Sequence, residues 1–195
     1  MLVEDKAGNL GKKVERARLS GVITERDLQA LSWVISQGVM TVDQIYRAIY
    51  SSRDVGSSRH AYRRVQFLVD AGYLTAVTAA HKKDRFLKAT KRAQHLLEVK
   101  SVPDVTRMLH VPTLAEIPHA EVLTEIRIAI AKAGKHGDGL WWRSEGSLLE
   151  DESFPAARFR DLMPDALWIT KSGKRVAIVQ LMLFYGFRLM VRIEI

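Results

Sequence analysis

A Pro-Asp pair near the carboxyl end of the chain is the first candidate for chemistry. Pro164 and Asp165 open an apolar segment, and a basic turn and a second apolar segment follow. Carboxylates on such a strand-turn-strand frame can hold Mg²⁺, and a neighbouring lysine can orient the water that attacks a phosphodiester. The second segment, however, carries Gln180 and Met182 where an acid and a lysine are needed. Gln binds a hard cation less well than a carboxylate, and Met neither donates a hydrogen bond nor carries charge.

A concentration of basic residues is the second candidate. The chain of 195 residues has a net charge of +8, and residues 53–92 hold ten Lys and Arg against three Asp and Glu. Such a surface suits a polyanion, because each neutralised phosphate releases condensed counterions. From charge alone, a solvated basic face without a partner is an equal alternative.

The elements that position this charge follow from capping and periodicity. Thr24 predicts the start of a helix that Gly38 ends, and Thr41 predicts the start of a second helix. A third helix, SRHAYRRVQFLVDAG, ends at Gly72. Two alternating runs, residues 73–77 and 85–89, flank a polar tip and predict a β-hairpin, and a further helix reaches residue 100. Three helices and a hairpin are the order of a winged helix-turn-helix domain.

In that arrangement the third helix buries one face and offers the other to the major groove of DNA. The tip of the hairpin lies over the adjacent backbone or minor groove. The alternative is a winged helix used only for protein contacts. The sequence predicts DNA contacts from Ser57, Ser58, Arg59, His60, Arg63, Arg64, His81, Lys82, Lys83 and Arg85.

Three stretches resemble the winged-helix half of the replication-relaxation family of plasmids and other mobile elements. They are TERDLQALSWVISQGVMTVDQIYRAIY, RRVQFLVDAGYLTAV and FLKATKRAQHLL. The second half of that family often has a helix beginning with His, a Trp-containing strand and Pro-Asp-Ala, and here His119, Trp141-Trp142 and Pro164-Asp165-Ala166 match. The resemblance spans about residues 22–180. It implies DNA binding by Arg59, Arg63, Arg64 and the wing, without naming a target.

Prolines in residues 101–118 predict a linker, so the expected plan is an arm (1–20), a winged helix (21–100), the linker and an α/β domain (119–195). The order helix, strand, strand-turn-strand resembles the core of PD-(D/E)xK nucleases, with Glu121 or Glu125, Asp165 and Gln180 at the ligand positions. Because Gln180 and Met182 break that pattern, we predict an α+β protein whose second domain has a degenerate, nuclease-like mixed sheet. We expect no catalytic residues, no metal and no cofactor. A Mg²⁺-dependent endonuclease with atypical ligands is the alternative.

The expected partners are double-stranded DNA, a second copy of the chain, and replication or mobilisation proteins. The role would be transcriptional regulation, or plasmid replication or transfer. An adaptor without DNA affinity is a third hypothesis. The apolar tail after Gln180 is a buried strand, a dimer contact or the product of a truncation. The amino terminus lacks a signal peptide and the longest apolar run is too short to cross a bilayer, so we expect a cytoplasmic protein.

Overall fold

Three helices, a small sheet and a fourth helix make up the described part of the amino-terminal half of the protein. The computed structural model describes residues 22–51, 58–77, 85–102, 112–134, 141–152, 154, 163–183, 186–189 and 193–194. The helices are α2 (Glu25–Gln37), α3 (Val42–Ile45) with its π-helical continuation η1 (Tyr46–Tyr50), and α4 (Ser58–Asp70). The strands β1 (Met40–Thr41), β2 (Leu74–Val77) and β3 (Phe86–Ala89) pair antiparallel in the order β1-β3-β2, and α5 (Lys91–Val99) follows. This is the predicted winged helix-turn-helix order.

Local signals set most of these boundaries. Thr24 and Thr41 each begin a helix with a capping box, in which the hydroxyl accepts from the third helical amide and that residue's side chain accepts from the cap amide. Gly38 and Gly72 end α2 and α4 at φ 76° and 74°, a region that favours glycine. The second helix differs from its prediction, because after one turn it widens into η1. Such π-turns are rare and often lie at functional sites.

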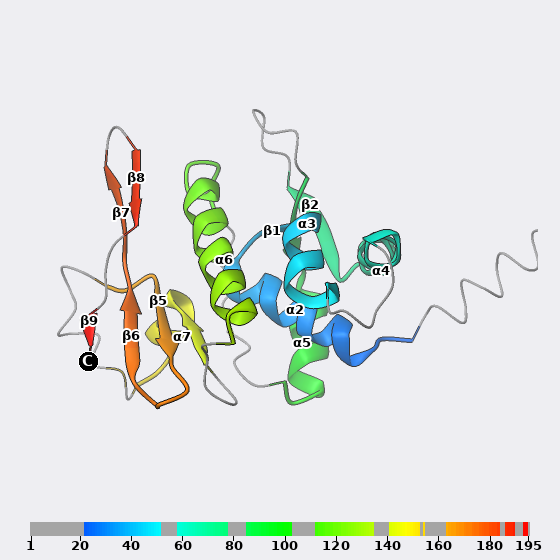
Figure 1. Ribbon diagram of the computed structural model, residues 1–195. Coiled ribbons are helices and arrows are strands. Elements are labelled where there is room, and N and C mark those ends of the chain that lie inside the picture. Colours follow the sequence, from blue (N-terminus) through cyan, green and yellow to red (C-terminus); the bar gives the residue numbers. More distant parts are fainter. Residues whose placement is uncertain are drawn as a thin grey trace, which may run out of the picture.

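The described part of the second half consists of a long helix, a short helix and two antiparallel sheets (Figure 1). Helix α6 (Ile117–Lys132) begins two residues before its predicted start. One sheet has the order β4-β5-β6-β9, and β7 and β8 pair only with each other among the described strands. The bounds are β4 (Trp142–Ser144), α7 (Glu145–Leu149), β5 (Ala166–Ile169), β6 (Arg175–Ile178), β7 (Gln180–Leu183), β8 (Gly186–Leu189) and β9 (Ile193–Glu194).

The α+β class is confirmed, and the details of the sheet differ from expectation. All pairings between the described strands are antiparallel, so the mixed, nuclease-like sheet is not confirmed. The second apolar segment is interrupted at Val179, between β6 and β7, and in the apolar tail β8 and β9 belong to different sheets. The short helix α7 directly follows β4. None of the described helices is long and apolar enough to cross a membrane.

Helix α6 lies between the winged helix and the sheet (Figure 1). Its first turns place Ile117 and Ala120 in one apolar cluster with Val39 and Phe86. Further along, Leu123 packs with the sheet residues Trp142, Ala166 and Ile178. Helix α6 therefore buries apolar surface against both the winged helix and the sheet. The predicted division at residues 101–118 stays a prediction, and residues 103–111 of that segment lie outside the described ranges.

Arg127, a buried residue of α6, contacts side chains of both the winged helix and the sheet. The Arg127 guanidinium lies 4.0 Å from the Trp33 ring centroid and 5.6 Å from those of Trp141 and Trp142. It also donates to Ser36 Oγ, and the Gln37 carboxamide, oriented with its oxygen inward, accepts from Arg127 Nη1 and Trp142 Nε1. A desolvated cation over aromatic faces contributes about 2 kcal/mol. Helices α2 and α6 and strand β4 therefore meet at one side chain.

Candidate nucleic-acid interface

The outer face of α4 carries the exposed cations of the candidate interface. Ala61, Val65 and Leu68 are buried against the core, at the spacing of one helical face. Arg59 and Arg63 are exposed and, four residues apart, share one side of the helix. The other predicted contacts on this exposed surface are Ser58 and His60, and Tyr62 lies beside them.

Arg64 does not belong to that exposed face. Its side chain is only 12% exposed and forms an ion pair with the buried carboxylate of Asp27 at the start of α2. Arg64 Nε donates to both Asp27 oxygens at 2.9 and 3.0 Å, and Nη2 reaches Asp27 and the Val22 carbonyl. The guanidinium also stacks on Phe67 at 4.5 Å. The prediction of Arg64 as an outward-facing residue is therefore corrected, because helical spacing alone could not show that its partner lies on α2.

Of the predicted contacts in the wing, the structure describes Arg85. The hairpin register pairs Val77 with Phe86 and Leu74 with Ala89, so the predicted strands form. Arg85 is exposed immediately before β3. Ser57 before α4, and His81, Lys82 and Lys83 at the wing tip, lie outside the described residues.

Asp27 is the residue that sequence analysis missed. Burial would raise the pKa of its carboxyl, but hydrogen bonds from Arg64 and Thr24 outweigh that cost and hold the pKa below its usual value. Burial, followed by the charge of Asp27, raises the pKa of Tyr50, whose hydroxyl donates to Asp27 Oδ1 at 3.0 Å. The capping box could have identified Asp27 as a cap, whereas nothing local identifies its two remote partners.

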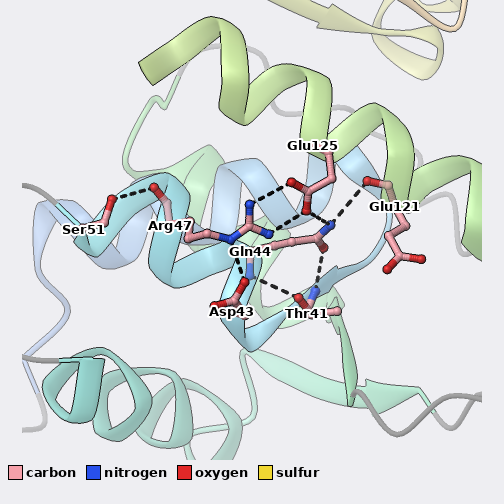
Figure 2. Close-up of polar contacts among 7 residues, drawn as sticks. All are labelled: Thr41, Asp43, Gln44, Arg47, Ser51, Glu121 and Glu125. Carbon is pink, nitrogen blue, oxygen red and sulfur yellow. Dashed lines mark hydrogen bonds and ion pairs between the residues drawn. The ribbon is translucent and has the colours of Figure 1, made fainter. Parts of the chain in front are cut away.

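In the second half, two of the candidate nuclease acids, Glu125 and Asp165, pair with basic side chains. Arg47 of η1 donates to both carboxylate oxygens of Glu125, at 2.7 and 2.6 Å, and Gln44 adds a bond at 3.0 Å (Figure 2). The hydrogen bonds from Arg47 hold the pKa of Glu125 below its usual value, and Glu125 in turn raises the pKa of Arg47. The Glu121 carboxylate points away from this cluster in Figure 2, while the Glu121 carbonyl accepts from Gln44.

Asp165 pairs with His119 instead of with another acid. The His119 Nε2 to Asp165 Oδ1 distance is 3.0 Å. The hydrogen bond to Asp165 raises the pKa of His119, and the charges of Glu145 and Glu116 act in the same direction. The side chain of Gln180 is not described, although the β5-β6 register pairs Ala166 with Ile178 and so places residue 180 beyond the paired segment. Among the described side chains, no group of three His, Asp or Glu residues could hold a metal ion.

Comparisons with known proteins yield one structural likeness. No family model matches the chain, and no curated protein matches it. The chain resembles a solved structure from Halomicrobium mukohataei, described as a protein with a GntR superfamily winged-helix-turn-helix domain, with 22% identity and a TM-score of 0.32 over 64% of this chain and 80% of that one. A likeness this remote says nothing of function, so the winged-helix assignment rests on the order and pairing of the elements. The resemblance to the replication-relaxation family gains no match and stays a prediction.

Proposed function

We propose that the protein binds double-stranded DNA through the outer face of α4 and the adjoining wing. The exposed pair Arg59 and Arg63, opposite the buried stripe of α4, is the observation that carries the proposal. Arginine grips guanine bidentately in the major groove and also pairs with phosphates. Arg85 adds an exposed cation beside the end of β3 that leads to the wing tip.

The protein would be encoded by a mobile element and would act as a homodimer. Its role would be transcriptional regulation, or plasmid replication or transfer. A single winged helix buries a modest surface on DNA, and two half-sites multiply the affinity. The pairing of Glu125 with Arg47 and of Asp165 with His119 favours a supporting role for the second half. The protein would bind DNA without cutting it, so supercoiled plasmid should stay intact when it is incubated with the protein and Mg²⁺.

The test removes two cations from α4 and, as a matched control, two from a distant turn. Arg59→Ala with Arg63→Ala should weaken binding to a random duplex at least about tenfold at low salt. The slope of log Kobs against log salt should fall by about two, since each phosphate contact contributes about 0.9.

Lys171→Ala with Lys174→Ala removes the same charge from the exposed β5-β6 turn and should leave the slope unchanged. If both pairs of substitutions weaken binding equally, net charge alone explains the affinity and the assignment to α4 is wrong. If the unaltered protein does not retard duplex at low salt, the proposed function is wrong.

A further inference from the structure

The buried carboxylate of Asp27 joins three segments of the winged helix. The residue has 0% of its surface exposed. Thr24 donates to it from the cap of α2, through its amide at 2.7 Å and its hydroxyl at 2.6 Å. Tyr50 donates from the last residue of η1, and Arg64 donates from the middle of α4. Every partner is a donor, which is the environment that a buried carboxylate requires.

This arrangement goes beyond a helix cap. The acid of a capping box needs only the cap amide as its partner. Asp27 also accepts from a guanidinium, which binds a carboxylate in a fixed, planar geometry. The bond therefore constrains the direction of the Arg64 side chain as well as its distance from α2.

The constraint bears on the rotation of α4 about its axis. The rest of the buried stripe of α4 is Ala61, Val65 and Leu68, and apolar contacts are non-directional. Arg63 is the immediate neighbour of Arg64 in the chain and Arg59 is one turn earlier. A helix held at Arg64 consequently presents both exposed arginines in one direction.

We propose that Asp27 is a positioning residue for DNA binding, which aims Arg59 and Arg63 by holding Arg64 and Tyr50. The inference rests on the proposed function of α4. It assigns Arg64 to the support of the interface and Arg59 and Arg63 to its surface. Asp27 itself, being buried, would not touch the DNA.

Neutralising Asp27 distinguishes positioning from simple electrostatics, because the two predict opposite changes in DNA affinity. Asp27→Asn makes the protein one unit more positive, which by electrostatics alone would strengthen DNA binding. Positioning predicts the reverse, a weakening of about five- to tenfold for duplex binding at moderate salt. Glu25→Gln is the matched control, because it removes one acid from the exposed side of the same helical turn. It should leave binding unchanged or slightly stronger.

A second background separates positioning from general destabilisation. In Arg64→Met protein, Asp27→Asn should cause no further loss of affinity, because no guanidinium remains to be held. A merely destabilising substitution would weaken binding in both backgrounds. Circular dichroism checks that each variant is folded at the assay temperature.

Tyr50→Phe keeps the ion pair and removes one hydrogen bond, so it serves if Asp27→Asn does not fold. It should weaken binding about twofold. Folded Asp27→Asn or Tyr50→Phe protein that binds as tightly as the unaltered protein would overturn the inference while leaving the proposed function standing. Failure of the unaltered protein and of Glu25→Gln to bind duplex would overturn both.

Discussion

At the scale of single residues, His119 offers a pH-dependent contact between α6 and the start of β5. Its pKa is raised from 6.5 by Asp165, so the folded state binds its proton more tightly than the unfolded chain does. The pair's contribution is fully present below about pH 6.5 and is lost as pH rises through the higher pKa of the folded state. For a partly exposed pair we expect about 1 kcal/mol. The free energy of unfolding of the unaltered protein should therefore decline between pH 5.5 and 9. Urea unfolding of His119→Gln protein over the same range should lack this part of the decline.

Two further substitutions control that experiment. Asp165→Asn should remove the same pH dependence from the other side of the pair. His95→Gln removes a histidine on the exposed side of α5 and should leave the decline as it is in the unaltered protein. If His119→Gln keeps the full decline, the pair does not contribute to stability in this pH range.

At the scale of elements, Glu125 connects α6 to the π-helical segment η1. Its side chain accepts two hydrogen bonds from Arg47 but is 45% exposed, so solvent screening limits what the pair contributes. Glu125→Gln should lower the free energy of unfolding at pH 7 by about 0.5 to 1 kcal/mol. The loss should shrink as pH falls below 4.5 through the lowered pKa of Glu125, because protonation removes the same charge.

Glu152→Gln is the matched control for this change. Glu152 is exposed after α7, and neutralising it should leave stability at pH 7 within a few tenths of a kcal/mol of the unaltered protein. If the free energy of unfolding falls equally in the two variants, the ion pair between Arg47 and Glu125 makes no specific contribution to stability. Chemical denaturation at pH 7 and pH 4 measures both.

Short-range signals made the winged helix predictable from the sequence. The capping boxes at Thr24 and Thr41 and the glycines that end α2 and α4 lie within a few residues of the boundaries they set. Long-range pairing was not predictable, because Arg64 meets Asp27 across 37 residues of chain. Helical spacing therefore placed Arg64 on the outer face together with Arg63.

The second half shows the same limit more strongly. Periodicity predicted the existence of β5 and β6, but it gave no sign that the strand would break at Val179. The order of elements suggested a nuclease-like sheet, whereas the register and the antiparallel pairing depend on contacts between distant residues. Likewise, the sequence made Glu125 a candidate metal ligand, because nothing near it in the chain indicates its partner Arg47 on η1.

At the scale of the whole molecule, α6 makes the described parts of the winged helix and the sheet one packed body. Arg127 joins them through Trp33 on one side and Trp141 and Trp142 on the other. Removing a buried, hydrogen-bonded arginine leaves a cavity and unpaired polar groups, so Arg127→Ala should cost about 2 to 4 kcal/mol. Arg63→Ala, an exposed arginine on α4, is the control and should cost less than about 0.5 kcal/mol.

The same contacts predict how the protein unfolds. Three of the four tryptophans, Trp33, Trp141 and Trp142, lie at the junction and the fourth, Trp168, lies on β5, so tryptophan fluorescence reports the junction together with the sheet. Far-ultraviolet circular dichroism reports the helices, most of which belong to the winged helix. If α6 couples the two halves, both signals should follow one urea transition in the unaltered protein. Arg127→Ala weakens the junction more than either core, so fluorescence should change at a lower urea concentration than the dichroism in that variant. Two separate transitions in the unaltered protein would mean that the halves unfold independently, and that α6 lies against the winged helix without stabilising it.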